Sequence, residues 1–242
     1  MNKSEILQRL LDGDRLDLRN ADLSGSDFSE MDLSGLDLSG ANLNGCNFTN
    51  ANLDRTILVN AKLIECNFVK TQMSNINAVN ATFTGGVFLK TRINYAILIN
   101  TNIHFCKFTN VSLQSTDLSH ASISNTSIYN SNLQKSNLTG ATIENVNLID
   151  AYLRDSIMTM AIISYARVAK SDFTGVNLSC GEVHNSVMGG SCLRDVNLIA
   201  ATLTEIEMDD VNPTGINLLM ANLSSVSWGD SDINVDFTCV NQ

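Results

Sequence analysis

The sequence predicts an all-β protein whose chain winds into a four-sided parallel β-helix. The first observation is a period of five: a large apolar residue stands at every fifth position from Leu18 to Ile233, and only Ala78 and Pro213 depart from this rule. A helix would need apolar residues about 3.6 apart, and a half-buried strand a spacing of about 2. A fixed short period is instead typical of a solenoid, whose coils bury their inner faces against one another.

A second period, of twenty residues, sets the size of the coil. Phenylalanines recur at this spacing, and so do cysteines at a smaller interior position: Phe28, Phe48, Phe68, Phe88 and Phe108, then Cys46, Cys66 and Cys106. Four pentapeptides per coil predict four sides, with like side chains stacked in columns. At a strand spacing of about 4.8 Å, about 11 coils would form a rod of roughly 50 Å.

Positions around the interior residues carry their own expectations. Asp22, Asp27, Asp32 and Asp37 each precede an interior residue, and short carboxylates of this kind bond nearby backbone amides at turns. Cys46 and Cys66 should be stacked neighbours inside the rod, where we expect buried free thiols rather than a disulfide.

The repeat keeps its register without interruption, which favours a single domain over residues 1–242. Residues 1–15 are expected to hold a short capping helix, because an open solenoid end exposes core and unpaired strand edges. The coils should occupy residues 16–235, and residues 236–242 should cover the last coil. Pro213 takes an interior slot, and because proline cannot donate to a strand ladder we expect a bulge or loop there.

Several of these pentapeptides resemble a known repeat: Ala21-Asp22-Leu23-Ser24-Gly25, Ala41-Asn42-Leu43-Asn44-Gly45, Ala51-Asn52-Leu53 and Ala221-Asn222-Leu223. They are similar to the A(D/N)LXX pattern of the pentapeptide-repeat family. The resemblance implies a right-handed quadrilateral parallel β-helix. It leaves function open, because some members of the family bind DNA gyrase and protect it, some are secreted bacterial effectors, and many have no known role.

The sequence predicts no enzyme and no cofactor. His104 and His184 fall in the same column but four coils apart, roughly 19 Å at strand spacing, and His120 lies at a different corner, so no two of the three histidines can share a metal ion. No glycine-rich phosphate loop or nucleophile elbow is present. No apolar run is long enough to span a membrane. The charged N-terminus and six cysteines without metal-type spacing favour the cytoplasm.

The net charge of −10 is unevenly distributed. Residues 1–60 hold ten acids and five bases, residues 61–199 hold eight acids and ten bases, and residues 200–242 hold seven acids and no base. A mimic of duplex DNA needs acids along its length, so binding to DNA gyrase is possible but disfavoured. The absence of a basic stripe excludes direct binding of nucleic acid.

Outward-facing apolar residues predict two protein-contact patches. The first is Ile57, Val59, Val79, Ile97 and Ile99; the second is Tyr152, Ile157, Met160, Ile162 and Tyr165. Stacked apolar side chains on a surface indicate a contact more strongly than scattered ones. We therefore predict a bacterial protein-binding or scaffold module with an unknown protein partner. The alternatives are a gyrase-binding DNA mimic and a secreted effector, and the oligomeric state stays open.

Overall fold

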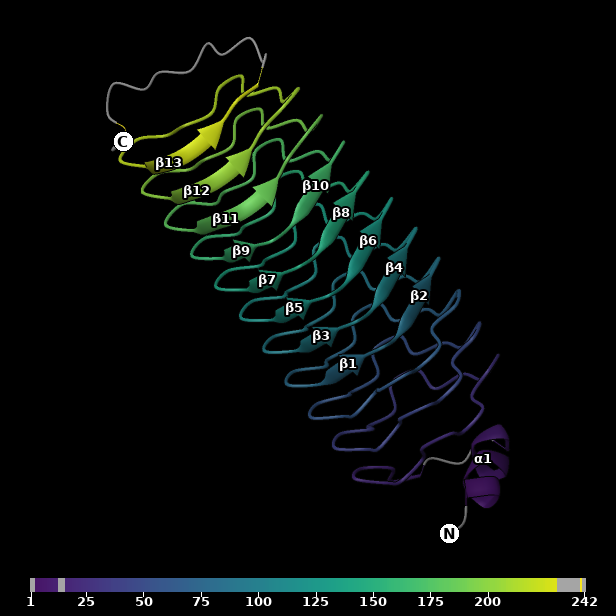
Figure 1. Ribbon diagram of the computed structural model, residues 1–242. Coiled ribbons are helices and arrows are strands. Elements are labelled where there is room, and N and C mark those ends of the chain that lie inside the picture. Colours follow the sequence, from purple (N-terminus) through teal and green to yellow (C-terminus); the bar gives the residue numbers. More distant parts are fainter. Residues whose placement is uncertain (1–2, 13–15, 230–239, 241–242) are drawn as a thin grey trace.

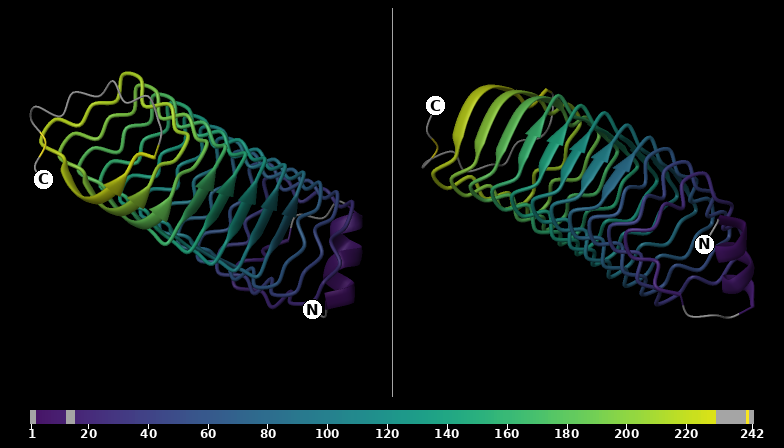
Figure 2. Two further views of the ribbon diagram at one scale, coloured as in Figure 1. Left: turned by 45° about the horizontal axis from the view of Figure 1, so that its top comes forward. Right: turned by 90° about the horizontal axis from the view of Figure 1, so that it is seen from below.

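The protein is an elongated rod of stacked coils with one short helix at its N-terminal end (Figures 1 and 2). The computed structural model describes residues 3–12, 16–229 and 240. The helix α1 spans Lys3–Leu11, within the expected residues 1–15. Its Ile6 is buried in the hydrophobic core, so α1 covers the first coil as a cap.

The strands are short, and all their pairings are parallel. Thirteen strands among the described residues are long enough to name: β1 (Thr82–Thr84), β2 (Val87–Leu89), β3 (Asn102–His104), β4 (Lys107–Thr109), β5 (Ser122–Ser124), β6 (Ser127–Tyr129), β7 (Thr142–Glu144), β8 (Asn147–Ile149), β9 (Ile162–Ser164), β10 (Arg167–Ala169), β11 (Glu182–Val187), β12 (Thr202–Glu207) and β13 (Asn222–Ser227). Each pairs with residues twenty positions away, as Phe83 does with Ile103. The predicted parallel β-solenoid and its twenty-residue register are thereby confirmed.

Named strands occupy only the coils from Thr82 onward. The earlier coils keep the same register through isolated bridges such as Asp22↔Asn42 and Ile57↔Asn77. The strand-bearing part of the solenoid is therefore shorter than the eleven coils expected from the repeat count.

The interior is a set of stacked columns. Phenylalanine rings form one of them, with centroid separations of 5.3 Å between Phe28 and Phe48, 5.2 Å to Phe68, 4.6 Å to Phe88 and 4.5 Å to Phe108. Phe83 from the adjacent side meets Phe68 at 6.1 Å and a tilt of 60°. Stacking in register thus follows from the twenty-residue period, as the sequence predicts.

Each corner of a coil is made by a residue with positive φ. This conformation recurs at every fifth position from Asn20 to Ser225. A turn of this kind, bonded from Ala21 N–H to the Leu18 carbonyl, needs a left-handed residue at its third position. Asparagine and glycine adopt that conformation with the least strain, which explains why they occupy so many corners.

Small polar side chains in the interior bond to the preceding coil. The thiols of Cys46 and Cys66 donate to the carbonyls of Leu23 and Leu43, and the Thr56 hydroxyl donates to Leu33 in the same way. Burial raises the pKa of the Cys66 thiol to about 12, which keeps it protonated and able to donate. Both side chains are thiols and the two do not form a disulfide, as expected.

The aspartates before the interior residues accept backbone hydrogen bonds, as predicted. The carboxylates of Asp27, Asp32 and Asp37 each accept the N–H of the residue two positions later, at 2.9–3.0 Å. Hydrogen bonds from Ser29, Ser34 and Ser39 lower the pKa of these three carboxyl groups. Asparagine fills the same role in later coils, since Asn52 accepts the Asp54 N–H.

These shifts predict that acid weakens the N-terminal coils. A carboxylate whose pKa is lower in the folded state stabilises the protein above its unfolded pKa, about 4, and loses that contribution as the pH falls further. The triple variant Asp27→Asn, Asp32→Asn, Asp37→Asn should therefore lose less thermal stability than wild type between neutral pH and about pH 3.

Circular dichroism melting at both pH values measures the difference. Equal acid sensitivity in wild type and the N-terminal variant would contradict the assignment.

The expected bulge at Pro213 is wrong. Pro213 is buried at the centre of a regular pentapeptide, and its neighbour Asn212 still bridges Cys192. At interior positions the backbone N–H donates to the following coil, as the Leu193 N–H does to the Asn212 carbonyl. Proline at position 213 thus removes only a hydrogen bond toward the following coil. The preceding ladder is therefore intact. The expected C-terminal cap, residues 236–242, lies outside the described residues except for Val240, which packs against the core.

Candidate protein-contact surface

The first predicted patch lies on the side of the rod whose interior residues are Leu58, Ala78 and Leu98. Ile57 and Ile97 are exposed there, but Asn77 bridges both and separates them. Val59, Val79 and Ile99 stack on consecutive coils and are only half-buried, because they follow the interior residue and lie against the corner. The patch therefore offers two exposed but separated side chains, Ile57 and Ile97, beside a column of half-buried ones.

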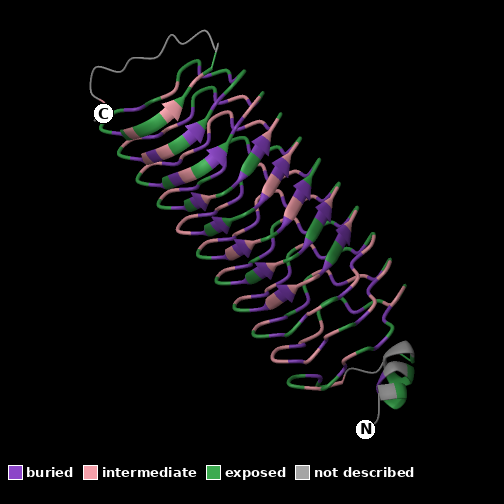
Figure 3. Cartoon of the chain, in the orientation of Figure 1, coloured by how far each residue is buried: buried purple, intermediate pink, exposed green. Residues whose placement is uncertain are grey.

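The second predicted patch is more exposed. Tyr152, Ile157, Met160, Ile162 and Tyr165 have between 40% and 60% of their surface accessible. They follow one another along a single coil and cross three sides of the rod. We call these five residues the contact band. Figure 3 shows that exposed and half-buried residues alternate with buried ones along each coil.

Exposed apolar residues also occur where the sequence reasoning did not look. Leu219 and Met220 are 46% and 62% exposed, and Cys180 and Ala200 are exposed as well. Cys180, Ala200 and Met220 occupy the same corner as Met160 on the three following coils. Reading the corner residues at intervals of twenty, as was done for the interior, would have revealed this row. Tyr95 and Phe105 are further exposed corner residues on other edges.

Titratable side chains form no reactive cluster in the described part of the chain. His104 Nδ1 lies 2.5 Å from the Ser124 hydroxyl, and His184 Nε2 lies 3.2 Å from the Glu182 carboxylate. No group of three histidine, cysteine or acidic residues that could hold a metal ion occurs among the described residues. None of the described helices is long and apolar enough to cross a membrane.

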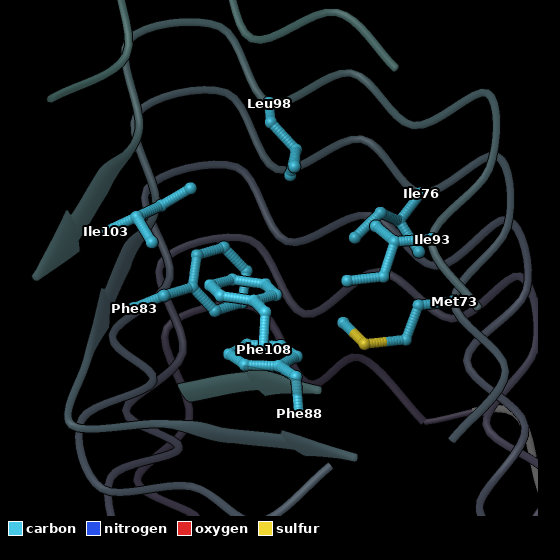
Figure 4. A pocket seen from close by; sticks show the side chains of 8 residues that line it. All are labelled: Met73, Ile76, Phe83, Phe88, Ile93, Leu98, Ile103 and Phe108. Carbon is cyan, nitrogen blue, oxygen red and sulfur yellow. The ribbon is translucent and has the colours of Figure 1, made fainter. Parts of the chain in front are cut away.

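The internal spaces in the described part of the rod are lined by apolar side chains, with Ser186 as the one polar residue. One is lined by the end of the phenylalanine stack and the aliphatic side chains opposite it, as Figure 4 shows for Met73, Ile76, Phe83, Phe88, Ile93, Leu98, Ile103 and Phe108. A space with so few polar groups cannot orient a polar substrate. What the geometry offers is an outer surface for contact.

These features define the class of protein: it is a parallel β-solenoid built from five-residue repeats around a packed interior. A family model for pentapeptide repeats matches residues 14–50, 46–85, 96–134, 121–159 and 143–179, more than half of the sequence. The chain belongs to the pentapeptide-repeat family. Comparison with curated protein sequences finds no match.

Solved structures show the same architecture. HetL, a pentapeptide repeat protein involved in heterocyst differentiation regulation from the cyanobacterium Nostoc sp. strain PCC 7120, is 22% identical with a TM-score of 0.55. The match covers 91% of this chain and 96% of HetL. At this identity the likeness concerns the fold alone.

Two further structures superpose less well. Full-length QnrB1, a plasmid-mediated fluoroquinolone resistance protein, is 21% identical with a TM-score of 0.30, over 84% of this chain and 86% of its own. The A-module of the mannuronan C-5 epimerase AlgE4 from Azotobacter vinelandii is 7% identical with a TM-score of 0.38, over 89% and 75%. Neither likeness bears on function.

Proposed function

We propose that this pentapeptide-repeat protein is a non-enzymatic protein-binding module, with the contact band as its contact surface. The observation that carries this proposal is the exposure of all five apolar side chains of the band within one stretch of coil. Tyrosine and methionine are enriched at protein interfaces, and so is arginine, which the band has nearby in Arg154 and Arg167.

The first patch is the weaker candidate for the same role. Only Ile57 and Ile97 project there, and a polar residue separates them. Isolated apolar residues are common on protein surfaces and need no partner to explain them. The first patch has similar side chains but lower exposure, so substitutions there serve as a matched control for substitutions in the contact band.

Affinity capture from a bacterial lysate tests the proposal. We expect wild-type protein to retain a partner that the variant Ile157→Asp, Tyr165→Asp loses. The variant Ile57→Asp, Ile97→Asp makes the same kind of change on the first patch and should retain it. Melting curves must show both variants folded. Loss of the partner only in the second variant would move the contact to the first patch, and equal retention by both would refute a role for either.

Inhibition or protection of a topoisomerase is the second candidate function, and the net charge of −10 is the observation that favours it. The described exposed acids gather toward the ends of the rod, whereas bases such as Lys70, Lys90 and Lys107 interrupt them in the middle coils. A DNA supercoiling assay with gyrase separates the two proposals. Unchanged gyrase activity at micromolar protein would remove the topoisomerase reading.

We further propose the cytoplasm as the compartment. Support comes from Cys46, Cys66 and Cys106, which serve as buried thiol donors in neighbouring coils and would need to stay reduced for that role.

A further inference from the structure

One corner of the rod changes chemistry along its length. From the N-terminal end, this corner carries residues suited to positive φ: Asn20, Gly40, Asn60, Asn80 and Asn100. After His120 and Gly140 it carries Met160, Cys180, Ala200 and Met220. The last four have φ between 53° and 60° and are all exposed. We call them the C-terminal ridge.

The ridge is continuous because its residues lie on consecutive coils. The N–H groups of Met160, Cys180 and Ala200 donate to carbonyls of residues 179, 199 and 219, each next to the following ridge residue. At about 4.8 Å per coil the four side chains span about 14 Å. Exposed Leu219 and Ile162 widen the row on its two sides.

These residues are unfavourable at this corner for two independent reasons. A side chain other than asparagine or glycine is strained in the left-handed conformation, and an exposed methionine gains nothing from burial. Asparagine satisfies both requirements at the same corner earlier in the rod. A row of apolar residues that opposes both preferences is typical of a contact surface.

Charges beside the ridge select the partner. Asp155 and Asp195 stand at the next corner on one side, and Glu182 and Glu205 stand on the other side. Of the described bases of these coils, Arg167 and Lys170 belong to the far side of the rod. Arg154 and Arg194 directly precede the two flanking aspartates on the side that turns away from the ridge, and Arg154 pairs there with Asp172 at 3.1 Å. A second copy would bring acids against acids, whereas a basic partner is attracted.

The spacing of the ridge matches one kind of basic partner. An α-helix repeats every 5.4 Å, close to the coil spacing of about 4.8 Å, so one helical turn can meet each coil. A straight row of side chains can also pack into the groove between rows on a helix, as helix ridges do.

We infer that the C-terminal ridge binds a basic amphipathic helix, with its apolar stripe against Met160 to Met220 and its lysines or arginines toward the flanking acids. This inference rests on the proposed protein-binding function and names the partner's chemistry. It extends the contact surface from the single coil of the band to four coils along one edge.

A synthetic peptide tests the inference on the full-length protein. The probe is a fluorescently labelled helix of about 14 residues, with leucine on one face at helical spacing and lysine elsewhere. Its control is a peptide of the same composition, scrambled so that no apolar stripe forms. We expect anisotropy to report binding of the first peptide only, and the binding to weaken as salt screens the acids.

Variants locate the binding edge. Met160→Asn, Met220→Asn should weaken binding roughly tenfold, which is the effect of losing central apolar contacts. Asparagine suits positive φ, so this variant should melt no lower than wild type. Tyr95→Asn, Phe105→Asn replaces exposed residues at other left-handed corners and should bind like wild type. Asp195→Asn, Glu205→Gln should weaken binding and reduce its salt dependence.

Each contrary result has a distinct meaning. Equal binding by the ridge variant, or binding of the scrambled peptide, overturns the inference. A wild-type dimer in sedimentation that dissociates in the ridge variant assigns the ridge to a second copy and also overturns it. Capture of a lysate partner that the peptide cannot displace refutes the basic helix while the protein-binding function stands. Failure of both capture and peptide binding refutes both.

Discussion

Replacing Phe68 with alanine should lower the free energy of unfolding by about 3–5 kcal/mol, within the range for buried phenylalanine truncation. Phe68 is fully buried and stacks between Phe48 at 5.2 Å and Phe88 at 4.6 Å, with the tilted ring of Phe83 at 6.1 Å beside it. Alanine would remove the ring from the middle of this column. The coils above and below are held by the backbone ladder, so they cannot close the space.

Chemical denaturation followed by circular dichroism measures this loss. Phe68→Leu is the matched control and should cost much less, because aliphatic residues already occupy the same column at Ile128 and Leu148. Hydrogen exchange should show the damage concentrated in neighbouring coils, since each coil of a solenoid contacts only its neighbours. A loss below about 1 kcal/mol for Phe68→Ala would contradict this expectation, because it would show that the neighbouring coils relax and fill the space.

The interior of this protein could be predicted closely from its sequence. Two periods place Phe28 above Phe48 and Cys46 above Cys66 before any coordinates are known, because a solenoid has only one register that buries every fifth residue. The same logic predicts which aspartates cap the corners. The fold is therefore encoded redundantly, and one exception such as Ala78 does not disturb it.

The surface could be predicted less well. Residues on both sides of an interior position were expected to face outward equally, yet Ile97 is exposed and Ile99 is half-buried. The left-handed corner turns the chain after Ile99 and covers its side chain in part, and this asymmetry follows from backbone conformation rather than from the apolar pattern. Met160 was predicted at the surface, but the other three residues of the C-terminal ridge were missed, because corner positions, which carry the exposed side chains, were not compared with one another.

Pro213 shows a further limit of sequence reasoning. The rule that proline interrupts a sheet predicts a bulge, but the N–H that proline lacks faces only one of its two neighbouring coils. Pairing with the preceding coil depends on Asn212, which still bridges Cys192, so that pairing stays intact. Only the direction of each hydrogen bond, visible in three dimensions, separates these outcomes.

The exception at Ala78 leads to the second prediction. This repeat reverses the sizes found in most repeats. Ile76 fills a position that holds a small residue (alanine, cysteine, serine, threonine or glycine) in most of them and a larger apolar residue in the others. Ala78 fills a position that holds a large apolar residue in every other repeat except that of Pro213. Both are fully buried. Figure 4 shows Ile76 pointing into the interior beside Ile93. We therefore expect the two residues to share one volume.

A double-mutant cycle tests this exchange. Ile76→Ala should cost about 2–5 kcal/mol by opening a cavity, and Ala78→Leu should cost about 1–3 kcal/mol by overpacking. Together they restore the common arrangement of small residue then leucine, as in Ala61 and Leu63. The double variant should thus be more stable than Ile76→Ala alone, with a coupling energy above about 1 kcal/mol.

Denaturant unfolding of the four proteins gives the coupling energy. Ile76→Val is the matched control and should cost only about 0.5–1.5 kcal/mol, since it keeps the branched shape. Additivity within about 0.5 kcal/mol would show that the two side chains occupy separate volumes. In that case the size reversal would be two independent departures from the repeat. Strong coupling would show instead that the coil fixes the total interior volume of this repeat. Either of the two positions, 76 or 78, could then hold the larger side chain.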